Sequence, residues 1–86
     1  MAKVIIRYWA AAKEAAGVQE ESAEAVTLSD LLNTVVASRK PDGRLADVLA
    51  RSSFLVNADP VGRNPRQSIV LDDGAVIEVL PPFAGG

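Results

Sequence analysis

The feature of this sequence that most constrains its fold is one amphipathic helix between β-forming segments. Thr27 is placed to cap the start of that helix, and Asp30, three residues later, completes a capping pair. Five aliphatic residues then follow the i, i+3, i+4, i+7, i+8 spacing of a single apolar stripe: Leu28, Leu31, Leu32, Val35 and Val36. A helix with one apolar face packs on a second layer, and the strand-like segments around it predict a sheet.

The end of this helix is also predicted by its sequence. Arg39 and Lys40 stand where cations interact favourably with the C-terminal end of a helix dipole. The run Pro41-Asp42-Gly43 then interrupts the helical pattern. We therefore expect the helix to continue to about residue 40.

β-branched and aromatic residues predict strands on both sides of the helix. The strongest segments are residues 3–9 near the start and 75–80 near the end, with weaker ones at 22–26 and 54–57. Pro81-Pro82 ends the last strand, because proline has no amide hydrogen to donate to a sheet. The order of these elements indicates an α+β domain with a mixed sheet.

The first strand has two faces of different character. Val4, Ile6 and Tyr8 alternate onto one face, which we expect the helix to cover. Arg7 and Trp9 lie on the other face, which is either a partner-binding surface or ordinary solvated surface.

Three shorter stretches complete the predicted elements. Residues 10–16 have high helix propensity and stop at Gly17, a natural C-terminal cap. Residues 44–51 predict a second short helix. Residues 57–68 are rich in turn formers and predict a loop with a short edge strand near Val61.

Composition excludes most kinds of catalytic site. The 86 residues contain no cysteine and no histidine, so there is no thiol nucleophile, imidazole base, or Cys or His metal site. A chain of this size buries only roughly 60% of its surface on folding, which leaves little room for an enclosed active site. The carboxylates lack the spacing of a calcium loop, so we expect no bound metal.

Charge and hydropathy argue against two classes of partner. The net charge of −2 provides no basic surface for nucleic acid. The apolar start of the chain is interrupted at Arg7 and is too short for a signal peptide or a membrane span. From Glu14 to Asp30 every charged residue is acidic, a run typical of a solvated face, with partner contact as the alternative. We expect a cytoplasmic protein with no membrane partner.

The chain ends in a segment unlike the rest. From Val79 to Gly86 no side chain is charged, and Pro81-Pro82 holds the backbone extended. The last six residues could reach at most about 20 Å when stretched. Terminal glycines allow close approach of the backbone, which suits a peptide that threads a narrow channel into the active site of a partner.

Such an end offers one reactive group, its carboxylate. Adenylation by ATP would convert the Gly86 carboxylate to a mixed anhydride, and a sulfur nucleophile could then leave a thiocarboxylate. This chemistry requires no catalytic side chain in the carrier, which agrees with the absence of cysteine and histidine. The alternative is a flexible terminus that contains glycine by chance.

Three stretches resemble the MoaD/ThiS family of ubiquitin-like sulfur carriers. They are Val4–Gly17, the helix start Thr27–Leu32 and the end Asp72–Gly86. Pro-Pro before a tail of small residues favours the MoaD branch, the small subunits of molybdopterin synthase. Two positions depart mildly from the family pattern: Trp9 stands where Phe is more usual, and Asp73 precedes the glycine of the last turn instead of following it.

The resemblance implies a β-grasp (ubiquitin-like) fold for residues 1–80, with one main helix across one face of a mixed sheet and the first and last strands parallel at its centre. Residues 81–86 would form an extended, flexible tail. In that tail Gly86 would react, Gly85 and Ala84 would thread the channel, and the partner surface would be bound by Phe83, Pro82 and Pro81. For Phe83 the alternative is packing back onto the sheet.

The resemblance also implies partners. An E1-like enzyme would adenylate Gly86 with ATP, a persulfide donor would supply sulfur, and the large subunit of molybdopterin synthase would receive the tail in a 2+2 heterotetramer. The sulfur would pass to cyclic pyranopterin monophosphate in molybdenum cofactor biosynthesis, with the catalytic side chains on the large subunit. The carrier would bind no cofactor itself. Three alternatives stay open: a carrier for cysteine or thiamin synthesis, a ubiquitin-like modifier joined to lysines, and an interaction module with an incidental tail.

Overall fold

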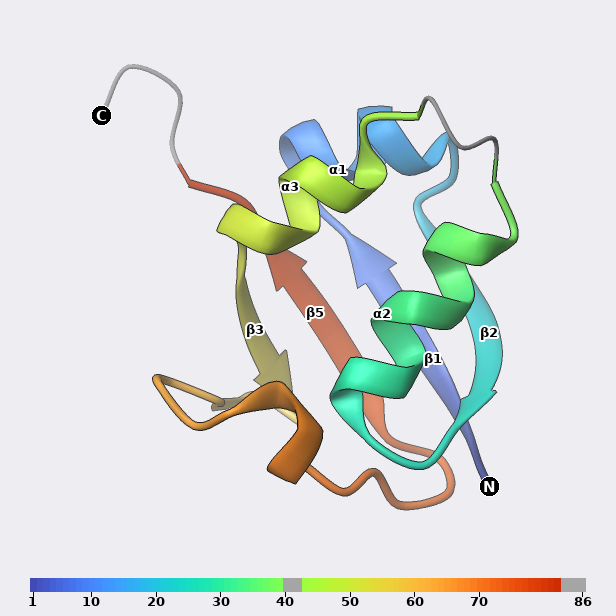
Figure 1. Ribbon diagram of the computed structural model, residues 1–86, viewed down its shortest axis with the longest axis vertical. Helices are drawn as coiled ribbons and strands as arrows, with labels where there is room; N and C mark the ends of the chain where they lie inside the picture. Colours follow the sequence, from blue (N-terminus) through green and yellow to red (C-terminus); the bar gives the residue numbers. More distant parts are fainter. Residues whose placement is uncertain (40–42, 83–86) are drawn as a thin grey trace.

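Five strands form one mixed sheet in the order β2-β1-β5-β3-β4 in the computed structural model, which describes residues 1–39 and 43–82 (Figure 1). The elements in chain order are β1 (Ala2–Tyr8), α1 (Ala10–Ala16), β2 (Glu20–Ala25), α2 (Leu28–Ala37), α3 (Leu45–Arg51), β3 (Ser53–Val56), β4 (Asp59–Pro60), the 3₁₀ helix η1 (Arg66–Ser68) and β5 (Val76–Leu80). The predicted strands and helices are all present, with ends that differ by at most three residues from the predicted ranges.

The first and last strands lie side by side and run parallel. Ile5 pairs with Val76, and Tyr8 pairs with Val79. β2 adds to β1 and β3 adds to β5, both antiparallel, so β5 is the central strand. This confirms the β-grasp arrangement predicted for the domain.

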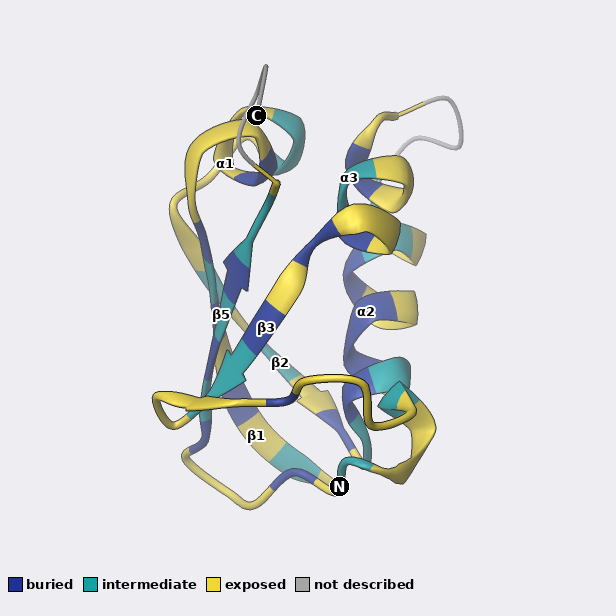
Figure 2. Cartoon of the chain, turned by 90° about the vertical axis from the view of Figure 1, so that its left-hand side faces the viewer, coloured by how far each residue is buried: buried dark blue, intermediate teal, exposed yellow. Residues whose placement is uncertain are grey.

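The core lies between α2 and the sheet. The face of β1 that carries Val4, Ile6 and Tyr8 is fully buried, as predicted. Four residues of the apolar stripe of α2 are buried against that face: Leu28, Leu31, Leu32 and Val35. Figure 2 shows the buried residues of α2 on its sheet-facing side, with α3 on the same side of the sheet. Val36, at the edge of the stripe, is half-buried.

The start of α2 agrees with the prediction, but its end does not. Thr27 Oγ1 accepts a hydrogen bond from the Asp30 amide at 3.1 Å, and Asp30 Oδ2 accepts one from the Thr27 amide at 3.3 Å, which completes the capping box. The helix ends at Ala37, not near residue 40. Arg39 lies beyond the helix, and its Nη1 donates to the carbonyl oxygen of Val35 at 2.7 Å. The cation therefore satisfies the helix end from outside it.

The two short helices gather at one end of the sheet. α1 and α3 contact each other there, at the edge where the parallel strands β1 and β5 both end (Figure 1). α1 stops at Gly17, whose φ of 82° is the left-handed conformation predicted for that cap. This edge of the sheet is where the predicted tail leaves the domain.

The tight turn between β3 and β4 contains a strained residue, which allows a stability prediction. Asn57 and Ala58 have φ values of 50° and 70°, as a two-residue type I′ hairpin requires. Alanine is unfavourable in this conformation, whereas glycine adopts it freely. We expect Ala58→Gly to raise the free energy of unfolding by roughly 1 kcal/mol, measured by urea denaturation.

A matched control for this change is Ala50→Gly, at an exposed position in the last turn of α3, where the backbone is still helical. The same exchange there should lower the free energy of unfolding by about 1 kcal/mol, because glycine disfavours a helix interior. Destabilisation by both exchanges would contradict the strain assigned to Ala58.

Candidate functional site

The predicted site begins where β5 ends. The last strand stops at Leu80, as predicted, and Pro81 is half-buried while Pro82 is exposed. The other predicted tail residues lie outside the described residues: Phe83, Ala84, Gly85 and Gly86. The described part of the site is therefore the base of the tail and the surface around it.

A mainly apolar hollow of about 550 Å³ adjoins the base of the tail. Because β1 and β5 are parallel and in register, the residues that follow them emerge at the same edge of the sheet. Trp9, directly after β1, and Leu80, the last residue of β5, both line this hollow. Pro81 and Pro82 line it as well, and Arg51 from α3 adds a charge.

Trp9 is held in place from two sides. Its Nε1 donates a hydrogen bond to Glu78 Oε2 at 3.2 Å, across the β1–β5 pair. The Arg7 guanidinium carbon lies 5.4 Å from the centre of the indole ring, within the range of a cation–π contact. Arg7 also forms an ion pair with Glu20, with 3.6 Å between Arg7 Nε and Glu20 Oε1. Trp9 is 41% exposed, so it presents an aromatic surface beside the base of the tail.

The face of the sheet away from α2 continues this surface. Ile5 is 37% exposed there, and its strand partner Val76 is half-buried on the same face. Leu55 pairs with Glu78 and is also half-buried. The predicted second face of β1 is therefore a mixed apolar and charged surface that reaches from the middle of the sheet to the tail.

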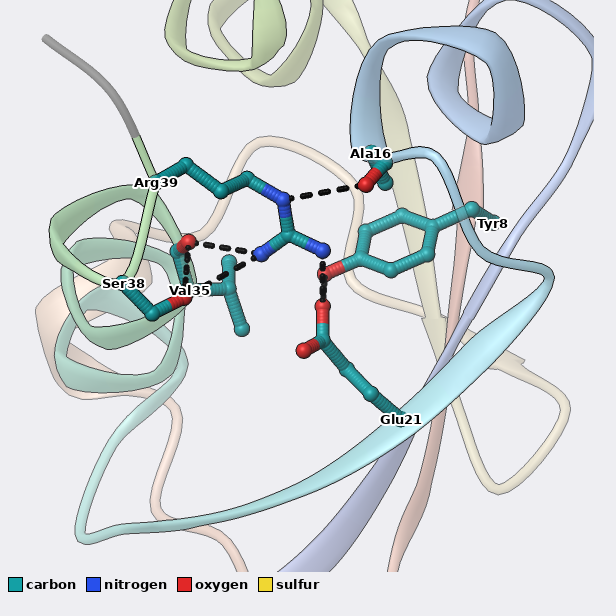
Figure 3. Close-up of polar contacts among 6 residues, drawn as sticks. All are labelled: Tyr8, Ala16, Glu21, Val35, Ser38 and Arg39. Atoms are coloured by element: carbon teal, nitrogen blue, oxygen red, sulfur yellow. Dashed lines mark hydrogen bonds and ion pairs between the residues drawn. The ribbon is translucent and has the colours of Figure 1, made fainter.

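A partly buried polar cluster, which sequence patterns did not reveal, lies on the face of the sheet that α2 covers (Figure 3). Tyr8 Oη donates to Glu21 Oε2 at 2.6 Å, and Arg39 Nη2 donates to the same oxygen at 2.6 Å. Arg39 also donates from Nε to the carbonyl oxygen of Ala16 at 3.2 Å. Burial, followed by the hydrogen bond to Glu21, raises the pKa of the Tyr8 hydroxyl above its ordinary value, so the hydroxyl remains a donor.

This cluster corrects, at Glu21, the prediction that the acidic run from Glu14 to Asp30 is a solvated face; the other four acidic residues of the run are exposed, as predicted. Glu21 pairs in register with Ile6, so it points to the helix side of the sheet, where it is half-buried. The sequence feature that could have revealed this position is the alternation of β2, which places Glu21 on the same face as Ala23 and Ala25. The cluster joins β1, β2, and the ends of α1 and α2, which is a structural role.

Two features are absent from the described residues: a cluster of metal ligands and a membrane-spanning helix. Within residues 1–39 and 43–82, no group of three or more acidic side chains is placed to hold a metal ion. None of the helices in that part of the chain is long and apolar enough to cross a membrane. The described residues can present the start of a peptide arm beside a mainly apolar hollow.

Comparison with known proteins points to one family. The model of the ThiS family matches residues 6–86, nearly the whole chain. No curated protein sequence matches significantly. Among solved structures, small archaeal modifier protein 1 from Methanosarcina acetivorans has a TM-score of 0.83 and 24% identity, and the match covers 100% of this chain and 98% of that one.

Two further similar structures are subunits of molybdopterin-converting factors. The putative subunit 1 from Pyrococcus furiosus has a TM-score of 0.77 and 24% identity, with 96% of this chain and 100% of that one covered. Subunit 1 from Helicobacter pylori, in a complex with subunit 2, has a TM-score of 0.66 and 25% identity, with 98% and 99% covered. These similarities show the shared fold along the whole chain.

Proposed function

Because this chain belongs to the ThiS family of ubiquitin-like sulfur carriers, we propose that it is the small, sulfur-donating subunit of a molybdopterin synthase. The observation that carries the proposal is the course of the central strand. β5 delivers Pro81-Pro82 and the tail to one edge of the sheet, beside the ordered ring of Trp9. The chain has no cysteine or histidine of its own, which suits a carrier whose reaction takes place in other enzymes.

In this proposal the Gly86 carboxylate is the reacting group. One of its oxygens attacks the α-phosphate of ATP in an E1-like enzyme and releases pyrophosphate. The terminal sulfur of a persulfide donor then attacks the acyl carbon and expels AMP, and a thiol reduces the resulting acyl disulfide to the thiocarboxylate. The carrier in this thiocarboxylate form, called the charged carrier below, donates its sulfur to cyclic pyranopterin monophosphate in the large subunit. The two kinds of subunit form a 2+2 heterotetramer.

The contribution of this chain is positioning. The prolines fix φ near −65° at the start of the arm, so the arm leaves the sheet in a restricted direction. Gly85 and Ala84 allow a narrow channel, while Phe83 and the prolines bind its entrance. The similarity to the subunit 1 of Helicobacter pylori, which is seen with its subunit 2, supports a large-subunit partner.

A second candidate function is that of a ubiquitin-like modifier joined to lysines through Gly86. The similarity to small archaeal modifier protein 1 favours it, because that fold matches this chain over its full length. Both functions begin with adenylation of the same carboxylate, and they differ in the nucleophile that follows. A carrier for cysteine or thiamin synthesis would differ only in the final acceptor.

Intact-mass analysis tests the proposal. After incubation with an E1-like enzyme, ATP and a persulfide donor, we expect the full chain to gain the mass of one sulfur-for-oxygen exchange. The charged carrier should then convert cyclic pyranopterin monophosphate when the large subunit is added. Ladders on lysines of other proteins would instead support the modifier, and a charged carrier that is inactive with the large subunit would favour another acceptor.

A further inference from the structure

The base of the arm has a cationic side that the proposed function does not assign. Arg51, the last residue of α3, lines the hollow that contains Trp9 and Leu80. It also lines a second hollow on the α3 side of Pro81-Pro82, together with Arg44. Figure 1 shows the C-terminal end of α3 beside the end of β5, so Arg51 adjoins the point where the arm leaves the domain.

The charge of this side is opposite to that of the whole chain. The net charge of the protein is −2, yet Arg44 and Arg51 outnumber Asp47 around the second hollow. Both arginines are exposed, and neither forms an ion pair with a residue of the described ranges. Their guanidinium groups are therefore available to a carboxylate, which arginine binds through two parallel hydrogen bonds.

In the proposed function, in which Gly86 reacts, the length of the arm brings a partner onto this surface. Four residues, 83–86, follow Pro82, and four extended residues span at most about 14 Å. An enzyme that acts on Gly86 therefore brings its active site within that distance of Pro82. Its surface then covers the residues next to Pro82, which include Arg51 and the apolar hollow.

We infer that Arg51 is a docking residue that binds an acidic side chain of the enzymes that receive the arm, while an apolar side chain of the same enzyme enters the hollow between Trp9 and Leu80. The apolar lining beside the cation indicates a protein partner, because a phosphate ligand has no apolar group to bury against that lining. This inference rests on the proposed function, since it requires an enzyme that acts on Gly86.

Charge reversal at Arg51 tests the inference. We expect Arg51→Glu to raise the Kd of the full carrier for its E1-like enzyme by at least about tenfold, because it places like charges together. Arg51→Gln should give a smaller rise, and the rate of adenylation at saturating carrier should not change. The Kd of the wild-type carrier should also increase with salt more steeply than that of either variant.

Arg63→Glu provides the matched control, because Arg63 is also exposed and belongs to the loop after β4, which lies at the opposite end of the sheet from the arm (Figure 1). The Kd of the Arg63→Glu carrier for the E1-like enzyme should stay within about twofold of the wild-type value. Thermal unfolding of all three variants verifies that they fold.

Each contrary outcome has a distinct meaning. If the wild type is charged with sulfur while Arg51→Glu and Arg51→Gln bind as tightly as wild type, the docking role is wrong and the carrier function stands. If Arg63→Glu weakens binding as much as Arg51→Glu, the effect is one of net charge, and the assignment to Arg51 is wrong. If no E1-like enzyme adenylates the wild type, the proposed function and this inference both fail.

Discussion

Deleting Gly86 should abolish formation of the thiocarboxylate while the fold stays intact. The deletion withdraws the terminal carboxylate by one residue, about 3.4 Å along an extended chain. A displacement of only about 1 Å can cost a reaction a factor of roughly 100, so we expect no detectable product. Intact mass after incubation with the activating enzyme, ATP and sulfur donor measures the product, and circular dichroism verifies the fold.

Two variants that are one residue longer complete this experiment. One residue added after Gly86 should be as damaging as the deletion, because the reacting group is then no longer the carboxylate of Gly86. One residue added before Met1 should have no effect, since β1 begins at the opposite end of the sheet from the end of β5 (Figure 1). Full activity of the carrier without Gly86 would show that its carboxylate is not the reacting group.

Replacing Arg39 by alanine should lower the free energy of unfolding by about 2–3 kcal/mol. The change removes charge-assisted hydrogen bonds to Glu21 and to the backbone carbonyls of Ala16 and Val35. It leaves Glu21 half-buried without its cation. In a domain of this size each kcal/mol corresponds to about 4–8 °C in Tm, so urea denaturation and thermal unfolding should both report the loss.

Arg63→Ala is the control for this loss, because Arg63 is exposed and forms no ion pair with another described residue; its effect should stay below about 0.5 kcal/mol. A double-mutant cycle with Glu21→Ala isolates the pair: the free energy of unfolding lost in the double mutant should be smaller than the sum of the losses in the two single mutants. A loss below about 1 kcal/mol for Arg39→Ala would mean that the cluster is not an important constraint on the fold.

These two changes separate the reaction from the scaffold. Gly86 should affect the reaction without affecting stability, because the arm follows the last strand of the sheet. Arg39 should affect stability, because it joins the ends of α1 and α2 to β2. The proposed function predicts this division, because in it the domain presents the arm and the partners carry out the chemistry.

Patterns between near neighbours were sufficient for the elements and for the fold class. The stripe from Leu28 to Val35, its capping box, and the alternation of β1 all act within a few residues, so they could be identified in advance. The end of β5 at Leu80 followed from the missing amide hydrogens of the two prolines. The division at residue 80 into domain and tail stays a prediction, because Phe83 to Gly86 lie outside the described residues.

Contacts between distant residues decided the rest. The helix was predicted to end near residue 40, but it ends at Ala37. Arg39 lies outside the helix and donates a hydrogen bond to Glu21, which is 18 residues away. The sequence left open whether Trp9 lies on a partner-binding surface or on solvated surface. Its hydrogen-bond acceptor, Glu78, lies 69 residues further along the chain, so its surroundings could not be predicted. Local propensity cannot report such pairs, since only the parallel pairing of β1 with β5 brings Trp9, Glu78 and the base of the arm together.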